Sequence, residues 1–126
     1  MAVQRLSGGR LLASVAGMPV LLLTTTGRRT GKARTTPLTF FRDGDDLVVI
    51  ASNGGSDEPP AWSLNLVAHP EASVRIGSTR IEVRARMATP EERARLWSEI
   101  TATFAGYARY EQRTTRTIPV FLLTPV

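Results

Sequence analysis

The sequence predicts an α+β fold, a small barrel of mostly antiparallel strands with a few peripheral helices. Short apolar or alternating segments separated by turn residues predict several hairpins, with only a few helical segments between them. The chain lacks the series of strand–helix–strand units that a doubly wound parallel sheet requires. Its 126 residues are the length of one domain. We therefore expect residues 1–126 to form a single domain, with a helical extension at residues 1–18.

The first half of the chain is expected to contribute one short helix and three strands. The apolar runs and the residues that interrupt them predict a helix that ends near Gly17, and strands at residues 20–25, 35–42 and 47–52. Pro37 has no N–H group to donate, which favours an edge or bulge position for the second strand. Asp43 and Gly44 are typical of the turn of a hairpin.

The second half is expected to contain two helices, a further helical turn and three strands. The pattern predicts a helix at residues 61–68, strands at 72–76 and 80–88, a helix at 90–103, a helical turn with a loop at 106–116, and a strand at 118–123. Residues 80–88 alternate between apolar and charged side chains, as in a half-buried antiparallel strand. The side chains expected to face inward from this strand are Ile81, Val83, Ala85 and Met87.

The helix at residues 90–103 has a well-defined start. Thr89 precedes Pro90, and Glu92 follows three residues after the threonine, which is the pattern of a capping box with proline at the first helical position. Helical spacing then predicts the apolar face. That face is expected to consist of Ala94, Trp97, Ile100 and Phe104.

Several kinds of chemistry are excluded by composition. The chain has no cysteine, so disulfides, thiolate nucleophiles and cysteine-based metal sites are absent. It has one histidine, His69, which makes a histidine-based metal site or a catalytic triad improbable. No nucleophile elbow, zincin motif, dinucleotide fingerprint or complete Walker loop is present. We therefore expect no metal, and a bound cofactor would have to carry any reaction.

The positive charge of the chain is concentrated near its start. The net charge is +5, yet residues 1–42 hold seven cations and no acid, and residues 43–126 hold nine cations and eleven acids. Four of the seven cations lie in the segment 28–34, between residues that favour a tight loop. Guanidinium groups bind phosphate and carboxylate in a bidentate manner, so this loop predicts a polyanionic partner.

No segment predicts a membrane span. The longest apolar stretch, residues 11–23, is shorter than the ~20 residues a spanning helix needs and is interrupted by Pro19. We expect a cytoplasmic protein. Arg5, Arg10 and Arg42 lie outside the cationic loop, and they leave open a peripheral contact with the inner face of the cell membrane.

Three sequence blocks resemble the deazaflavin-dependent nitroreductase family. The first block is residues 23–38 (LTTTGRRTGKARTTPL), and the second joins residues 51–55 (ASNGG) to residues 60–70 (PAWSLNLVAHP). The third contains residues 107–110 (YARY), 116–120 (RTIPV) and 123–125 (LTP). The resemblance covers roughly residues 19–126, with the blocks in the family's order and spacing.

The resemblance implies a split β-barrel that binds coenzyme F420. In this family the reduced deazaflavin delivers a hydride to activated acceptors. The implied acceptor is a quinone, a nitroaromatic compound or a conjugated carbonyl compound. The coenzyme carries a phosphodiester and a polyglutamate tail, which suit the cationic loop. We expect no nucleic-acid partner, and no oligomeric state is predicted.

The resemblance also implies the site residues. The positions that match the coenzyme site are Arg28, Arg29, Thr30, Arg34, Thr35, Thr36, Pro37, Leu38, Thr39, Ile50, Ala51, Ser52, Asn53, Ala61, Trp62, Ser63, Leu64, Asn65 and Tyr107. The basic loop would hold the phosphate and tail, and the segment 50–53 would line the edge of the ring. The candidates for orienting the substrate are Ser52, Phe104 and Tyr110, and no residue is expected to act covalently.

Other interpretations remain open from sequence. The same fold could bind FMN instead, or the protein could be a non-enzymatic F420 carrier or sensor. A basic nucleic-acid-binding module is a further alternative, although the chain lacks a recognition helix and a stripe of aromatic residues for base stacking. Trp62 could belong to the core, Tyr107 and Tyr110 could pack on a helix, and Asn53 could serve only a turn.

Overall fold

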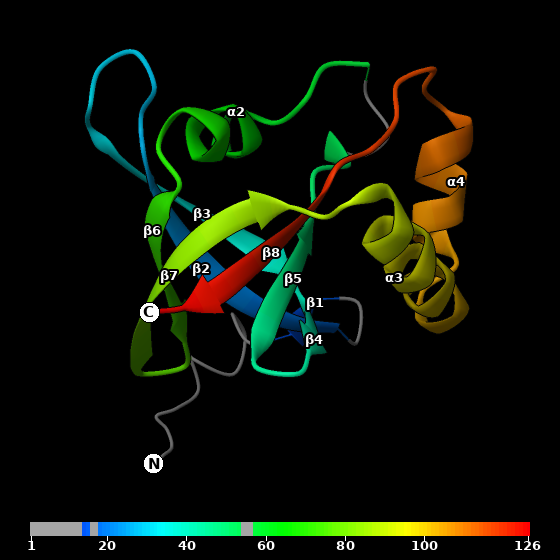
Figure 1. Cartoon of the computed structure of the whole chain (residues 1–126), viewed down its shortest axis with the longest axis horizontal. Coiled ribbons are helices and arrows are strands. Elements are labelled where there is room, and N and C mark those ends of the chain that lie inside the picture. The colour runs from blue at the N-terminus through cyan, green and yellow to red at the C-terminus, as the bar shows by residue number, and fades with distance from the viewer. Residues whose placement is uncertain (1–13, 16–17, 54–56) are drawn as a thin grey trace.

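Eight strands form one curled sheet in which every neighbouring pair is antiparallel (Figure 1). The computed structural model describes residues 14–15, 18–53 and 57–126. The strands in it are β1 (Ser14–Val15), β2 (Met18–Thr26), β3 (Ala33–Thr39), β4 (Phe41–Asp43), β5 (Asp46–Ile50), β6 (Glu71–Ile76), β7 (Thr79–Met87) and β8 (Val120–Pro125). The helices are α2 (Ala61–Ala68), α3 (Pro90–Thr103) and α4 (Gly106–Gln112).

The strand order makes a barrel that is left open on one side. The sheet runs β1-β2-β6-β7-β8-β5-β4, and β3 pairs with β2 alone. Because β3 pairs on one side only, Pro37 lies on an edge strand, as predicted. Gly44 and Gly77 adopt positive φ angles of 62° and 60° in the turns that join β4 to β5 and β6 to β7. Both predicted hairpin turns are therefore confirmed, but the strand predicted at residues 35–42 is divided into β3 and β4, and only β4 pairs with β5.

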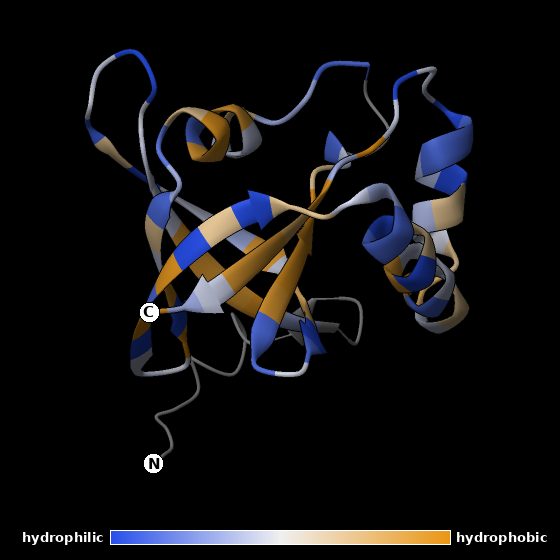
Figure 2. Ribbon diagram, viewed as in Figure 1, coloured by the Kyte–Doolittle hydropathy of each residue, from blue (hydrophilic) through white to orange (hydrophobic). Residues whose placement is uncertain are grey.

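Strands β5 and β8 are buried on both faces. Leu47 and Val49 of β5 belong to the core inside the barrel, whereas Val48 and Ile50 face the core beneath α3 and α4. Strand β8 alternates in the same way between the two cores. This double burial explains why residues 47–50 form a continuous apolar run, drawn in orange at the centre of Figure 2.

The helices lie in two places on the barrel. Helix α2 covers the end of the barrel near the β2–β3 loop, and α3 and α4 lie side by side against the opposite flank (Figure 1). Trp62 of α2 packs edge-to-face on Phe121 at a ring-centroid distance of 5.8 Å, which fixes α2 to the core. The predicted capping box is confirmed, because Thr89 accepts from the Glu92 backbone and the Glu92 carboxylate accepts from the Thr89 backbone.

Three expectations are corrected by the structure. Ser14–Val15 is a strand that pairs with β2, so these residues are not part of the predicted helical extension. Residue 18, the last of that extension, belongs to β2. The rest of the predicted extension, residues 1–13 and 16–17, lies outside the described residues. Ala94 is exposed and Leu96 is buried in its place, because the inward face of α3 is rotated relative to the predicted one. Met87 is 52% exposed, since it lies at the end of β7 where the barrel core stops.

Within the described residues, no helix combines the length and apolarity needed to cross a membrane.

Candidate functional site

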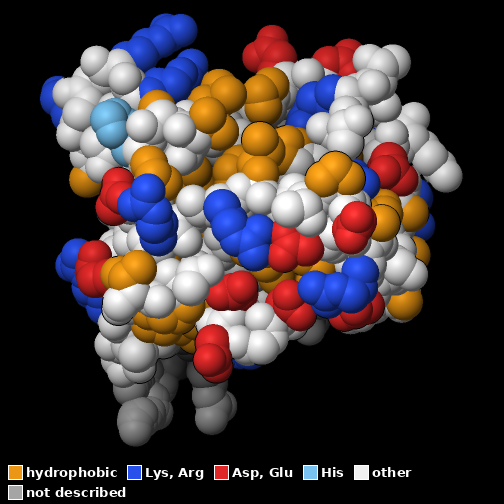
Figure 3. Space-filling model, viewed as in Figure 1, with side chains coloured by type: hydrophobic (Ala, Val, Ile, Leu, Met, Phe, Trp, Pro, Cys, Tyr) orange, Lys and Arg blue, Asp and Glu red, His pale blue; other side chains and the backbone are white. Residues whose placement is uncertain are grey.

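The cationic loop encloses one end of a groove. This end, the anion lobe, is a cavity of about 600 Å³ between the β2–β3 loop, β3 and the start of α2. Its lining consists of Gly27, Arg28, Arg29, Thr30, Ala33, Arg34, Thr35, Thr36, Ala61, Trp62 and Asn65. Cationic side chains gather on the surface at the upper left of Figure 3, where Figure 1 places this loop. The structure thus brings the predicted phosphate-binding residues together at one end of the barrel.

The loop from residue 27 to residue 32 is held in a tight turn. The backbone N–H of Gly27 donates to the carbonyl of Lys32 at 2.8 Å, and the N–H of Gly31 donates to the carbonyl of Gly27 at 2.9 Å. Gly31 has a φ of 72°, which favours glycine. A Cβ on Gly27 would lie 3.0 Å from the Thr30 hydroxyl and 3.1 Å from the Lys32 carbonyl. The backbone conformation of the loop therefore favours glycine at position 31, and a side chain at position 27 would be crowded by Thr30 and Lys32.

The cations of the loop form no salt bridge with the residues that the structure describes. None of the six salt bridges among the described residues includes Arg28, Arg29, Lys32 or Arg34. Five of the ten other arginines that the structure describes do have an acidic partner, for example Arg86 with Glu92 and Arg95 with Asp43. The loop therefore concentrates uncompensated positive charge at the groove, as expected for a site that binds a polyanion.

Asn65 connects the helix to this loop. Its side chain is 4% exposed, its Oδ1 accepts from the Arg28 backbone N–H at 3.0 Å, and its Nδ2 donates to the Thr25 hydroxyl at 3.1 Å. One amide thus joins α2, the end of β2 and the start of the loop. These contacts suggest a positional role, in addition to the place of Asn65 in the wall of the anion lobe.

The N-terminus of α2 lies where the two ends of the groove meet. Pro60 is the N-cap residue and makes no side-chain cap, and the first turn carries no acidic residue. The first N–H groups of a helix and its dipole both favour an anion. Ala61 and Trp62 line both ends of the groove, so this helix start contributes positive potential at the junction.

The other end of the groove, the ring lobe, is uncharged. It is a cavity of about 500 Å³ that shares Thr36, Ala61 and Trp62 with the anion lobe. Its lining consists of Thr36, Pro37, Leu38, Thr39, Ile50, Ser52, Asn53, Pro59, Pro60, Ala61, Trp62 and Tyr107. The lining contains apolar walls, hydroxyl groups and one amide, but no acid, base or histidine. This composition suits a planar polar heterocycle with a neutral acceptor beside it.

Tyr107 is the centre of an aromatic cluster behind the ring lobe. Its ring makes edge contacts with Phe41 at 5.9 Å, Trp97 at 6.4 Å, Phe104 at 5.3 Å and Tyr110 at 5.6 Å. Gly106 is required here, because a Cβ at this position would lie 2.7 Å from the Phe104 ring. The packing around Tyr107 fixes where its hydroxyl points.

The Tyr107 hydroxyl shares a hydrogen bond of 2.5 Å with the Thr39 hydroxyl. Burial raises the pKa of Tyr107 above its usual value, an effect that the bond to Thr39 partly offsets and the neighbouring Tyr110 reinforces. Tyr107 therefore keeps its proton across the neutral range.

Most of the predicted coenzyme residues line one of the two lobes, and three do not. Ala51 is fully buried, and the Ser63 hydroxyl donates to the Pro60 carbonyl at 2.7 Å inside α2. Leu64 is half-buried on the same helix and lies outside both linings.

The substrate-orienting candidates are divided between the lobe and the cluster. Ser52 lines the ring lobe, whereas Phe104 and Tyr110 pack on Tyr107 and reach neither lining. Gly27, Ala33, Pro59 and Pro60 line the groove and were not predicted as site residues, although the glycine and proline signals of both loops were visible in the sequence.

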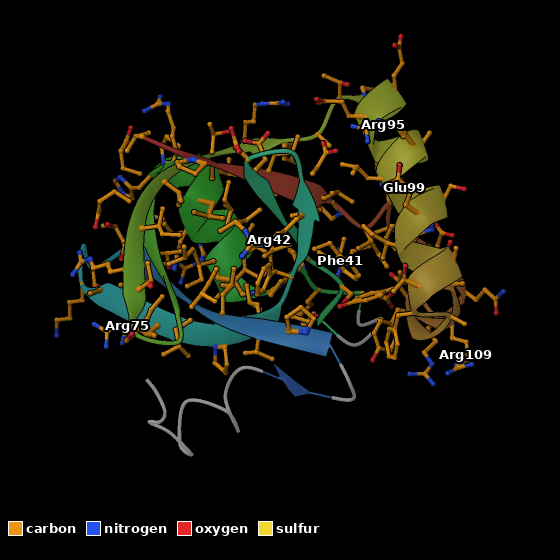
Figure 4. The ribbon with its side chains drawn as sticks, turned by 90° about the horizontal axis from the view of Figure 1, so that it is seen from below. Phe41, Arg42, Arg75, Arg95, Glu99 and Arg109 are labelled. Atoms are coloured by element: carbon orange, nitrogen blue, oxygen red, sulfur yellow. The ribbon has the colours of Figure 1, made fainter. Side chains whose placement is uncertain are left out.

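A third cavity of about 610 Å³ shares no residue with the groove. It lies between the start of β2, the β3–β4 connection and α3, and its walls are mostly apolar. Figure 4 shows this face, with Phe41 and Arg42 on one side and Glu99 of α3 on the other. No group of histidine and acidic residues suitable for a metal ion occurs in the part of the chain that the structure describes.

Comparison with known proteins identifies the family. The family model for F420H(2)-dependent quinone reductase matches residues 1–125. The chain belongs to this family. It is therefore an oxidoreductase whose coenzyme is F420, which excludes the FMN and carrier alternatives. Its fold is the split β-barrel of its structural neighbours.

Individual members of the family support the assignment. The chain is 41% identical over 127 residues to the F420H(2)-dependent quinone reductase Rv1261c of Mycobacterium tuberculosis, covering 98% of this chain and 85% of that protein. It is 39% identical over 108 residues to the protein named as putative F420H(2)-dependent quinone reductase Rv3178 of the same organism, covering 86% and 91%. The solved structure of the F420-H2 dependent reductase FDR-A has a TM-score of 0.75 and 36% identity, covering 83% of this chain and 93% of FDR-A.

The groove fits the coenzyme of this F420H(2)-dependent reductase family. F420 has a planar ring at one end and a polyanionic tail at the other, and the two lobes have matching chemistry in a matching arrangement. The cations of the anion lobe can pair with the negative charges of the tail. The lining of the ring lobe contains no charged residue and suits the planar ring.

Proposed function

We propose that this chain reduces a quinone to a hydroquinone with reduced F420, which is oxidised to F420, and that it binds the coenzyme along the whole groove. The observation that carries the proposal is that the two lobes are adjacent and share three lining residues, Thr36, Ala61 and Trp62. A ligand that spans this junction has its anionic part among the arginines and its planar part against Tyr107 and Trp62.

The anion lobe would hold the phosphodiester and the polyglutamate tail. Arg28, Arg29 and Arg34 supply guanidinium groups, and Thr30 and Thr35 add hydroxyl donors at the same wall. Charge-assisted bonds of this kind are stronger than neutral ones, so most of the binding free energy should arise at this end. The start of α2 would face the phosphate.

The ring lobe would hold the deazaflavin and the acceptor together. Pro37, Leu38, Ile50 and Trp62 give apolar walls that exclude water, and Ser52 and Asn53 add polar groups at one edge. Holding two reactants in contact within such a pocket lowers the entropic part of the barrier. The chain supplies proximity and a sheltered environment.

When bound, reduced F420 supplies a hydride to the acceptor. A quinone that receives a hydride also needs one proton to become a hydroquinone. Because the ring lobe has no titratable acid other than Tyr107, this proton would come from solvent or from a hydroxyl group. Ser52 would donate a hydrogen bond to the acceptor oxygen and so stabilise the negative charge that develops on it.

Nitroaromatic compounds and conjugated carbonyl compounds are alternative acceptors for the same site. The names of the relatives favour a quinone. A peripheral membrane contact is a further part of this proposal. Of the three cations outside the loop that leave such a contact open, Arg42 is the one that the structure describes, and it lies at the rim of the third cavity.

The test combines binding with turnover. Purified protein is titrated with F420 and binding is followed by deazaflavin fluorescence, and reduced F420 is then mixed with the quinone menadione while deazaflavin absorbance is recorded. Saturable binding and quinone-dependent recovery of absorbance are expected. Failure to bind up to high micromolar concentrations, or binding with recovery only for nitroaromatic acceptors, would contradict the proposal.

A further inference from the structure

Arg116 lies at the point where β5 leaves the sheet. The β5–β8 ladder ends with the pair Ile50 and Val120, and continuing the same register sets Ala51 opposite Pro119. The Ala51 N–H donates to the Pro119 carbonyl at 3.0 Å. In an antiparallel pair of this kind the second residue returns a hydrogen bond, but proline has no N–H to donate. The carbonyl of the fully buried Ala51 therefore needs another donor.

The Arg116 guanidinium supplies that donor. Its Nη2 donates to the Ala51 carbonyl and to the Ser52 carbonyl, each at 2.9 Å. The Arg116 backbone N–H donates to the Thr114 hydroxyl at 3.2 Å, and that hydroxyl donates to Asp57 at 2.8 Å. Arg116 thus belongs to the α4–β8 connection, and its side chain joins this connection to the segment that forms the edge of the ring lobe.

These two bonds fix two peptide planes. In a trans peptide the C=O and the N–H point in opposite directions, and the described residues contain no cis peptide. With the carbonyls of Ala51 and Ser52 directed at Arg116, the N–H groups of Ser52 and Asn53 are directed away from it. No described residue accepts a hydrogen bond from either N–H, and both residues line the ring lobe.

We infer that Arg116 is a positioning residue for the ring lobe. By holding the Ala51 and Ser52 carbonyls, it orients the N–H groups of Ser52 and Asn53 as donors for a polar edge of the bound ring or for the acceptor oxygen. It also fixes Asn53, whose φ of 47° is in the left-handed region, at the mouth of the lobe. The inference rests on the proposed function for the ligand, but the orientation of the segment is a property of the protein alone.

Arg93 provides a matched control. Like Arg116, it is part-buried and donates a side-chain hydrogen bond to a backbone carbonyl, that of Ile118 at 2.9 Å. It lies on α3, stacks on Trp97 at 4.6 Å from the ring centroid and lines neither lobe. Arg93→Met therefore removes a comparable hydrogen bond to a backbone carbonyl at a residue outside both lobes.

The first measurement uses the protein without coenzyme. Backbone ¹⁵N order parameters are determined for wild type, Arg116→Met, Arg116→Lys and Arg93→Met. In wild type we expect the order parameters of Ser52 and Asn53 to be near the value of rigid backbone, about 0.85. In Arg116→Met we expect them to fall below about 0.6. Arg116→Lys keeps a cationic donor and should recover part of the order. Unchanged order parameters for both residues in Arg116→Met would overturn the inference.

The second measurement uses F420 and menadione. We expect Arg116→Met to lower kcat about tenfold, with a smaller change in the KM for reduced F420. The absorbance spectrum of bound F420 should also move toward that of free F420. Both effects are expected because contacts to the ring are lost while the anion lobe is intact. Arg93→Met should show neither change even if its Tm falls equally. If Arg116→Met and Arg93→Met give the same kcat and spectrum, the inference fails. Absence of F420 binding by wild type would contradict the proposed function alone, because the order parameters still decide the role of Arg116.

Discussion

The Asn65 side chain accepts a hydrogen bond from the backbone N–H of Arg28 at 3.0 Å, across 37 residues of sequence. The bond connects a helix that covers the barrel to the first cation of the loop that forms the anion lobe. The Asn65 side chain also donates a hydrogen bond to the Thr25 hydroxyl, which holds the same amide against the end of β2. The position of the cationic loop therefore depends on a buried, uncharged side chain.

Replacing Asn65 by alanine should separate this loop from α2. The Arg28 N–H and the Thr25 hydroxyl lose a buried partner, which costs roughly 1–3 kcal/mol of stability, and the affinity for F420 should fall as well. Thermal unfolding and F420 titration measure the two effects. Ser63→Ala is the control, because Ser63 is equally buried on α2 but bonds only within the helix. Equal loss of F420 affinity in both variants would contradict the role assigned to Asn65.

Arg34→Ala should weaken F420 binding without changing the fold. The loss of a charge-assisted contact to an anion is worth roughly 1.5–3 kcal/mol, or about ten- to a hundredfold in Kd. The effect should shrink at high salt, because salt screens the attraction in wild type. Arg75→Ala is the control, since Arg75 is an exposed arginine of β6 outside both lobes. Similar affinities for Arg34→Ala and wild type at low salt would argue against this placement of the tail.

Tyr107→Phe should change how stability depends on alkaline pH. Burial raises the pKa of Tyr107 in the folded protein. The contribution of the protonated phenol to folding stability is therefore fully present below the unfolded pKa near 10, and it is lost as the pH rises through the higher folded pKa. The variant loses the bond to Thr39, about 1 kcal/mol, but should show less alkaline loss of stability. Denaturant unfolding at pH 8 and pH 11 measures both effects.

Thr39→Val is the matched control for Tyr107→Phe. It removes the same hydrogen bond and keeps the titrating phenol, so it should lose stability at pH 8 and retain the steep alkaline decline. If Thr39→Val and Tyr107→Phe have the same pH profile, Tyr107 does not titrate as described.

Glu92→Gln should flatten the acid side of the stability profile. The bonds from Arg86 and from the Thr89 backbone lower the pKa of Glu92 to about 2. Its contribution is therefore present above the unfolded pKa of about 4.5 and is lost as the pH falls toward 2. The difference between the Tm values at pH 7 and pH 3 should therefore be smaller in Glu92→Gln than in wild type. Glu91→Gln, in the same turn without these contacts, should behave like wild type, and a flattened profile there would contradict the assignment.

Local signals in the sequence were sufficient to predict most of the fold. Proline at both ends of α2 and the capping box at Thr89 gave helix limits that the structure confirms. The hairpins at Gly44 and Gly77 were predicted because these turns require residues that tolerate positive φ. The limits of β8 were less accurate, because Pro119 lies in the apolar run but outside the ladder.

Long-range contacts could not be predicted in this way. The predicted apolar face of α3 was wrong at Ala94, because packing on β5 and β8 determines which side of the helix faces inward. The roles of Asn65 and Arg116 depend on partners 37 and more than 60 residues away, which no local pattern encodes. Phe104 and Tyr110 were predicted to face the substrate, yet both rings pack on Tyr107, Phe104 from the end of α3 and Tyr110 from the next turn of α4.

We propose that one groove binds F420 with its tail among the arginines and its ring against Tyr107. The most direct test compares, by fluorescence titration, F420 with the same deazaflavin lacking the phosphodiester and polyglutamate tail. We expect the tail-less compound to bind at least about a hundredfold more weakly, and we expect Arg34→Ala to lower the affinity for F420 alone. Equal affinity for the two compounds, or an equal effect of Arg34→Ala on both, would contradict it.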